Sequence, residues 1–377
     1  MDVRQFRDEF PGELVPIVLW GHSDAAFVPA PLPPEWRPDE KLWPLLVEAG
    51  AKLSLLEGVG RSIRFPEILL QPAERREAIQ SSRIEGTIAT PRELLLADLT
   101  DEPPARSALR EVANCQRALE YLRQTPLPVS QRLMRELHSR LMDGVSTNAD
   151  PGEFRKVAVV IGPGTRYVAP PIDRLDGCLK NLEEFAHAEN RPSPLADCFL
   201  WHYQFEAIHP FRDGNGRVGR MLLSAMIQQK YSLTCPWIML SDHFARHRSR
   251  YIDLLYNVST QGAWNEWVHF CVEGVIDVTR RAIERFDQLR SLQDNYREVI
   301  QRSRRNARLL DVIDLLFRNP MIRIPRVAEI TRVTIPTASK DVQWLVGQQI
   351  LEEIHGIPRR TFLARAVYQI AYGDLDT

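Results

Sequence analysis

One stretch of the chain decides how its fold is interpreted: His209-Pro210-Phe211-Arg212-Asp213-Gly214-Asn215-Gly216-Arg217-Val218-Gly219-Arg220. The helix before it is expected to end at Pro210, because proline has no N–H and cannot continue a helix. The next helix is expected to open near Gly216, where glycines let backbone N–H groups turn toward one spot. The positive end of that helix adds to a cradle for anions. The stretch therefore predicts a phosphate site between two helices.

The side chains around these glycines supply what phosphate chemistry needs. Arg217 and Arg220 are three residues apart, hence on one helix face, and can bind phosphates through charge-assisted hydrogen bonds. Asp213 can hold Mg²⁺, an ion that typically takes one or two carboxylates together with substrate phosphates. His209 is the side chain here whose ordinary pKa suits a general base near neutrality. Each residue type is common alone, but this combination within one short stretch is rare.

The same stretch matches the Fic motif HxFx(D/E)GNGRxxR at every specified position, so the chain resembles the Fic family. The resemblance covers roughly residues 100–290 and implies transfer of AMP from ATP to a Tyr, Thr or Ser hydroxyl of a protein, including itself. His209 would be the base, and Asp213 would hold Mg²⁺ on the phosphates of ATP. The implied ATP and phosphate contacts are Gly214, Asn215, Gly216, Arg217, Arg220 and Tyr251. For Tyr251, a place in the core is an equally good interpretation.

Residues 151–168 are rich in β-branched side chains, with turn residues in the middle. This pattern predicts a single β-hairpin in an otherwise helical region. The hairpin resembles the Fic flap, whose exposed edge would pair with a target segment as an added strand. The expected flap residues are Val159, Val160, Ile161 and Tyr167. The alternative is a hairpin with no binding role.

A second motif precedes the first: Ser81-Ser82-Arg83-Ile84-Glu85-Gly86 fits the (S/T)xxxE(G/N) pattern of the Fic inhibitory helix. The resemblance implies that Glu85, on the same helix as Ser81, pairs with Arg220 and removes the partner of the γ-phosphate. Taken alone the hexapeptide is weak, because charged helices with Ser and Glu are common. Glu85 could instead position a water that hydrolyses the modified target, and the two roles stay open.

The remaining patterns are mostly helical. The proline-rich residues 1–40 are expected to be extended, wrapping or partly mobile. After residue 300, helices followed by two short strands predict a winged helix. The expected fold is mainly α: a Fic-type helical bundle with a β-hairpin flap, plus a small winged helix-turn-helix domain. The expected domains are 1–100 with the inhibitory helix, 101–295 as the catalytic unit, and 300–377 as the winged helix.

The winged helix leaves two functions open. Its recognition helix is expected at residues 335–345, and winged helices bind either DNA or other proteins. The candidate DNA contacts are Thr337, Ser339, Lys340, Gln343, Arg359 and Arg360. Homo-oligomerisation is also left open.

Composition excludes several other classes of protein. The 377 residues carry a formal net charge of -1, which gives no overall attraction to nucleic acid or membrane. Five scattered cysteines argue against a disulfide framework or a zinc site. The chain shows no signal peptide and no apolar run of membrane-spanning length, so a cytoplasmic protein without a membrane partner is expected.

Two other functions compete with AMP transfer. A phosphotransferase of the Doc type would use the nucleotide in the opposite orientation, but those relatives depart from the motif near the second arginine. A transcription regulator could use the same domain only to sense nucleotide. The intact His209 argues against pure sensing, which needs no base.

Overall fold

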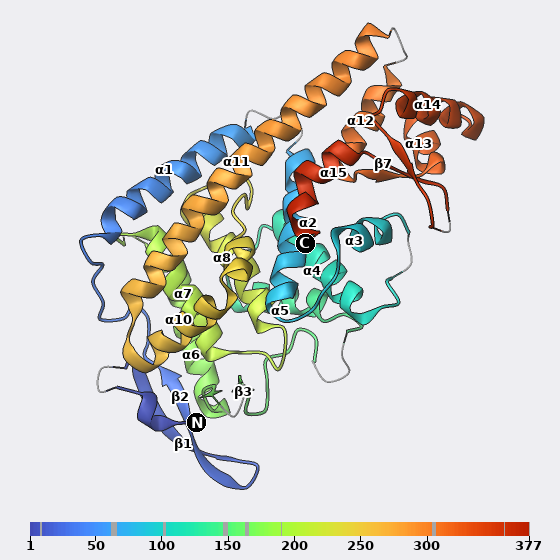
Figure 1. Cartoon of the computed structure of the whole chain (residues 1–377). Coiled ribbons are helices and arrows are strands. Elements are labelled where there is room, and N and C mark those ends of the chain that lie inside the picture. The colour runs from blue at the N-terminus through green and yellow to red at the C-terminus, as the bar shows by residue number, and fades with distance from the viewer. Residues whose placement is uncertain are drawn as a thin grey trace.

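The computed structural model describes residues 1–7, 10–61, 66–100, 103–145, 150–162, 166–189, 191–303, 307–357 and 359–376. The fold is mainly helical, as predicted. Its longest element is α11 (Trp264–Arg302), a 39-residue helix with α1 (Leu42–Arg61) packed alongside (Figure 1). α11 is continuous through residues 295–300, where the sequence suggested a domain boundary.

The other helices of the body are α2 (Glu67–Ile84), α3 (Pro91–Ala97), α4 (Ser107–Gln124), α5 (Gln131–Leu141), α6 (Ile172–Ala186), α7 (Pro194–Ile208), α8 (Asn215–Lys230), α9 (Ser241–Arg246) and α10 (Arg248–Gln261). The sequence did not predict α6. His247 separates α9 from α10. Among the described residues, no helix combines the length and apolarity needed to cross a bilayer.

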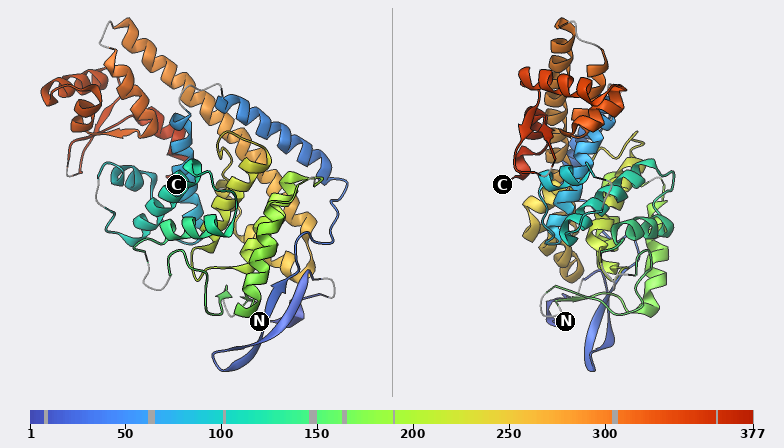
Figure 2. Two further views of the ribbon diagram at one scale, coloured as in Figure 1. Left: turned by 180° about the vertical axis from the view of Figure 1, so that it is seen from behind. Right: turned by 90° about the vertical axis from the view of Figure 1, so that its right-hand side faces the viewer.

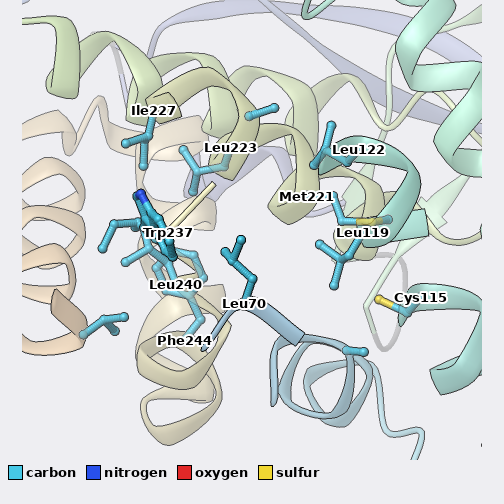
Figure 3. Close-up of a cluster of buried hydrophobic side chains, with 14 of the residues drawn as sticks. Leu70, Cys115, Leu119, Leu122, Met221, Leu223, Ile227, Trp237, Leu240 and Phe244 are labelled. Atoms are coloured by element: carbon cyan, nitrogen blue, oxygen red, sulfur yellow. The ribbon is translucent and has the colours of Figure 1, made fainter. Parts of the chain in front are cut away.

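Helix α2 is part of the core rather than an appendage. Leu70 of α2 lies in one apolar cluster with Leu119 of α4, Met221 of α8 and Phe244 of α9, all at most 1% exposed (Figure 3). Burying such side chains contributes about 1.5–3 kcal/mol each. The packing therefore sets the end of α2 beside α8.

The boundaries of α2 and α3 test two sequence signals. Proline is common in the first turn of a helix, yet Pro72 lies inside α2, because tertiary packing extends the helix on the N-terminal side of the proline. Thr90 and Glu93 form a capping box at the start of α3. The Glu93 backbone N–H donates to Thr90 Oγ1 at 3.2 Å, and the Thr90 backbone N–H donates to Glu93 Oε2 at 2.8 Å.

The N-terminal region is more ordered than its prolines suggested. β1 (Gly12–Leu19) and β2 (His22–Pro29) form an antiparallel hairpin in the register Leu19↔His22. Trp20 and Gly21 turn the chain with φ of 48° and 83°, the positive values that two-residue hairpins favour. Pro16 is accommodated because β1 is an edge strand.

The predicted hairpin near residues 151–168 is present but short. β3 (Val160–Ile161) pairs with β4 (Tyr167–Val168), and residues 163–165 of the expected turn lie outside the described residues. β4 packs against β2, where Leu19, Ala26 and Val168 form a small buried cluster.

The C-terminal unit comprises α12 (Arg308–Arg318), β5 (Met321–Ile322), α13 (Ile324–Thr331), α14 (Ile335–Gly347), β6 (Glu352–Ile354), β7 (Thr361–Leu363), α15 (Arg365–Tyr372) and the 3-10 helix η3 (Gly373–Leu375). Its strands are ordered β5-β7-β6. On α14, Lys340 and Gln343 are exposed, whereas Thr337 and Ser339 are half-buried. The winged-helix assignment and DNA binding stay predictions.

The C-terminal unit contacts both α2 and α11 directly (Figures 1 and 2). Arg76 of α2 donates to Asp374 at 2.5 Å and to the Ala371 carbonyl at 3.0 Å. Arg83 of α2 donates to the Leu375 carbonyl at 3.2 Å. The end of the chain therefore braces α2 on the side away from α8.

Candidate active site

The loop between α7 and α8 is held from outside by Arg155. His209 ends α7 with φ of 51°, a left-handed conformation that costs energy for a residue other than glycine. Arg155, only 4% exposed, donates to the His209 carbonyl at 2.8 Å and to the Pro170 carbonyl at 2.6 Å. Its backbone N–H donates to the Pro210 carbonyl at 2.9 Å. These bonds stabilise the turn that presents His209.

The loop is held from inside by Asn215 and Phe211. The Asn215 side chain accepts from the Phe211 N–H at 2.8 Å and donates to the Phe211 carbonyl at 2.8 Å. This side chain, expected on phosphate, is therefore engaged in shaping the loop. Phe211 is fully buried and stacks on His138 of α5, with ring centroids 3.9 Å apart.

His138 joins the loop to the segment before the flap. Its Nδ1 accepts from the Gly152 backbone N–H at 2.9 Å, so Nε2 carries the proton and donates to the Asp213 carbonyl at 3.1 Å. Burial lowers the pKa of His138 to about 4, which keeps the ring neutral and this tautomer in place at neutral pH.

His209 is prepared to act as a base. Its Nδ1 lies 3.3 Å from the Glu206 carbonyl, which can only accept, so Nδ1 carries the proton and Nε2 keeps a lone pair. Burial lowers the pKa of His209 to about 4, so the ring is neutral at neutral pH.

His209 lines a cavity of about 540 Å³, large enough for a nucleotide. The predicted site residues that share its lining are Glu85, Ile161, Tyr167, His209, Gly216, Arg220 and Tyr251. Asp213, Gly214, Asn215 and Arg217 are not part of this lining. Val159 and Val160 are half-buried beside the flap turn and are also outside it.

The end of α2 occupies Arg220. Arg220 donates through Nη2 to Glu85 Oε1 at 2.6 Å, and through Nε and Nη2 to the Ser81 hydroxyl and carbonyl, both at 2.9 Å. The Arg220 side chain is 2% exposed and that of Glu85 is 37% exposed, because the carboxylate faces the cavity. Burial would raise the pKa of Glu85, but the charge and hydrogen bond of Arg220 outweigh it and lower that pKa below its ordinary value.

The Glu85 carboxylate lies where an anion is expected. A Cβ at position 216 would lie 2.2 Å from Glu85 Oε1, so a larger residue there would displace the carboxylate from this position. Gly216 is in the first turn of α8, and Gly214 caps that helix with φ of 78°. The carboxylate thus occupies the positive end of the helix, as a phosphate would.

Arg217 has a different partner, which the sequence analysis missed. Its Nη1 donates to Glu111 Oε2 of α4 at 2.8 Å, and the Thr87 hydroxyl donates to the same oxygen at 3.0 Å. Its Nη2 lies 4.0 Å from Asp213 Oδ1.

Asp213 suits a magnesium ion held mainly by a substrate. Its side chain is 63% exposed, and Oδ1 accepts from the Gly214 backbone N–H at 2.6 Å. No cluster of three acidic, His or Cys ligands occurs in the described part of the chain. A single accessible carboxylate fits Mg²⁺, which keeps waters and binds phosphates.

Two predicted residues are anchored by their hydroxyls. The Tyr167 hydroxyl donates to the Ala207 carbonyl at 2.9 Å, so this side chain fastens the flap to α7. The Tyr251 hydroxyl contacts His202 Nε2 at 3.0 Å, and Tyr251 is 3% exposed. Tyr251 is therefore both a core residue and part of the cavity wall.

Two further cavity residues were missed. Glu206, one helical turn before His209, has an Oε1 without a hydrogen-bond partner in the described structure, and burial raises its pKa to about 8. Arg248 donates to the Ile84 carbonyl at 2.6 Å and so holds the end of α2. Glu206 could have been found from the sequence, because it lies three residues before His209 and hence on the same helix face. No local pattern indicated Arg248.

Comparisons with known proteins agree with this geometry. The Fic/DOC family matches residues 128–227, and the Fic/DOC family N-terminal region matches residues 43–122. A protein adenylyltransferase Fic from Culex quinquefasciatus is 26% identical over 227 residues, covering 55% of this chain and 43% of that protein. A probable protein adenylyltransferase from Aquifex aeolicus is 30% identical over 127 residues, covering 34% and 36%. The chain thus spans less than half the length of these relatives.

Solved structures show the same fold. A Fic family protein from Desulfovibrio desulfuricans G20 has a TM-score of 0.57 at 20% identity and covers 87% of this chain and 98% of its own. Fic-1 (aa134–508) from C. elegans has a TM-score of 0.52 at 19% identity, with coverage of 65% and 73%.

Proposed function

The chain belongs to the Fic/DOC family, and from that premise we propose that it is a protein adenylyltransferase restrained by its own helix α2. The observation that carries the proposal is a neutral His209 on the wall of a nucleotide-sized cavity that also contains Arg220 and the first turn of α8. Curated relatives named protein adenylyltransferase support the choice of reaction.

The reaction needs a base on one side of the α-phosphate. His209 Nε2 takes the proton of a target Ser, Thr or Tyr hydroxyl, and the oxygen of that hydroxyl forms a bond to the α-phosphorus of ATP. The bond between the α-phosphorus and the bridging oxygen breaks, and pyrophosphate leaves. The Nδ1 hydrogen bond to the Glu206 carbonyl fixes the ring in the tautomer that can accept this proton.

The phosphate end of ATP would lie at α8. Gly216 and the positive end of the helix attract the phosphates, and Arg220 neutralises the outer ones. Asp213 would hold Mg²⁺, which neutralises phosphate charge and orients the leaving group. Tyr251, Leu255 and Ser259 line the part of the cavity formed by α10, where the nucleoside would bind.

The inhibited state follows from the Glu85 contact. Glu85 and Ser81 use the Nε and Nη2 donors of Arg220, so that arginine cannot hold a phosphate until α2 releases it. A flap edge at Val160 and Ile161 would pair with the target, as in other strand additions. Hydrolysis of the modified target with water placed by Glu85 is the second candidate, favoured by the partial exposure of its carboxylate in the cavity.

The test uses ATP labelled at either the α- or the γ-phosphate, with Mg²⁺, and three forms of the chain: wild type, Glu85→Gly and Glu85→Gly with His209→Ala. We expect α-label on Glu85→Gly, little on wild type and none on the double variant. Transfer of γ-label would identify a phosphotransferase and overturn the proposal. Binding of ATP without transfer of either label to the chain or to lysate proteins would favour nucleotide sensing.

A further inference from the structure

We propose that Glu111 of α4 is a positioning residue: it orients Arg217 so that the rest of the guanidinium can hold a phosphate of ATP. The inference deepens the proposed function and rests on it. Neither Glu111 nor its helix belongs to the motif, and the pair joins segments that are 106 positions apart in the chain.

The contact between Arg217 and Glu111 is a short and largely buried ion pair. Arg217 Nη1 donates to Glu111 Oε2 at 2.8 Å, with the Arg217 side chain 3% and the Glu111 side chain 18% exposed. A buried guanidinium with a carboxylate on one edge has little freedom to rotate. The Thr87 hydroxyl bonds the same Glu111 oxygen at 3.0 Å and so restrains the carboxylate as well.

The described part of the protein leaves one donor of this guanidinium unused, although Arg217 lies outside the lining of the cavity that contains His209 and Arg220. In the described structure, Arg217 Nε is buried and has no hydrogen-bond partner. A buried donor without a partner destabilises the folded state, so its presence requires an explanation. The other acid near the guanidinium, Asp213, has its Oδ1 4.0 Å from Nη2, beyond hydrogen-bond range. A phosphate oxygen beside Asp213 would supply the missing acceptor.

Glu111 is placed to orient Arg217, not to inhibit it. Glu85 ends α2 and can leave with the end of that helix, whereas Glu111 is an internal residue of α4, which packs against both α2 and α8. Release of Glu85 would therefore uncover Arg220 while leaving Arg217 held in its orientation.

The test compares Glu111→Ala and Glu111→Gln in the Glu85→Gly background. Loss of a charge-assisted hydrogen bond is worth about 1.5–3 kcal/mol, so Glu111→Ala should lower kcat/KM for Mg·ATP by about tenfold or more, mainly through KM. Glu111→Gln keeps an oxygen acceptor and should recover most of the loss. Glu120→Ala, on the same helix and bonded to Gln116, is the matched control with KM unchanged.

Three results would overturn the proposal. A KM equal to that of the parent would show that Glu111 does not orient Arg217. Faster modification by Glu111→Ala would make Glu111 a second brake. Equal defects in Ala and Gln variants, with lower kcat and lower melting temperature at constant KM, would mean a structural role.

If the Glu85→Gly parent transfers no label, the proposed reaction fails, but calorimetric binding of Mg·ATP still tests Glu111. Binding about tenfold weaker in Glu111→Ala would uphold its role in holding phosphate. Unchanged binding would overturn it.

Discussion

Arg217 and Arg220 lie one helical turn apart on α8, both about 3% exposed, yet their surroundings differ. Arg220 gives Nε and Nη2 to the end of α2, whereas Arg217 gives one nitrogen to Glu111 of α4 and keeps its Nε unpaired. Arg220 is thus bound by residues at the end of α2, whereas Arg217 is bound by a residue inside α4. The proposed restraint by α2 therefore acts on Arg220 and leaves Arg217 unaffected.

Removing the Glu85 carboxylate should have the largest effect, because it changes the surroundings of Arg220 and not those of Arg217. Glu85→Gly frees Arg220 without touching Arg217, so self-modification should rise by roughly 10- to 100-fold, the range of a typical regulatory coupling. The measurement is the initial rate of α-label incorporation. Glu85→Gln keeps the side-chain length but loses the charge, so its rate of self-modification should lie between those of wild type and Glu85→Gly. A Glu85→Gly rate equal to wild type would contradict the inhibitory assignment.

A smaller increase in the rate of self-modification is expected when Arg220 loses the Ser81 hydroxyl. Ser81→Ala removes the acceptor of Arg220 Nε, which should weaken the inhibition a few-fold and cost about 1–3 kcal/mol of unfolding free energy. Rates and denaturant unfolding measure the two effects. Ser82→Ala is the control, because the buried Ser82 hydroxyl has no partner in the described structure. Equal effects from both substitutions would argue against the Ser81 contact.

The brace on the far side of α2 should matter less. Asp374→Ala removes the carboxylate that Arg76 contacts at 2.5 Å, leaving the Ala371 carbonyl at 3.0 Å and Asp242 at 3.4 Å. The melting temperature should drop by about 2 °C and amide exchange along α2 should quicken. Glu284→Ala, which breaks an exposed pair with Arg280, should change neither. Unaltered exchange in Asp374→Ala would show that the C-terminal contact does not restrain α2.

Mild acid should not release Arg220 from Glu85. The pKa of Glu85 is lowered, so the Arg220 pair is fully present above the ordinary carboxyl pKa and is lost only as pH falls through the depressed value. The ratio of Glu85→Gly to wild-type rates should therefore stay constant between about pH 6 and pH 8. A ratio that falls toward one on acidification would show that Glu85 becomes protonated in this range.

The helix–loop–helix around His209 was predicted because near neighbours in one short motif encode it. The Glu85–Arg220 contact joins residues 135 positions apart and was expected only because the chain resembles the Fic family. Arg155 and His138, which hold the loop, were missed because single residues from distant segments carry no local pattern. Glu111 was missed for the same reason.

Tertiary packing also overrode some local signals. Proline at position 72 normally marks a helix start, but α2 buries Leu69 and Leu70 before it and so extends through it. The N-terminal hairpin was missed because Pro16 and the prolines after residue 28 suggested an extended segment, while the Trp20-Gly21 turn gave the opposite signal.

The position of Glu85 at the start of α8 can also be considered in terms of mass action. Glu85 is a ligand tethered to its own binding site, so it acts at an effective concentration of about a millimolar or more, whatever the protein concentration. Under the proposed inhibition, dilution does not dissociate Glu85, and free nucleotide has to outcompete it at that local concentration. An agent that shifts α2, by contrast, changes the effective concentration itself and needs no access to the cavity.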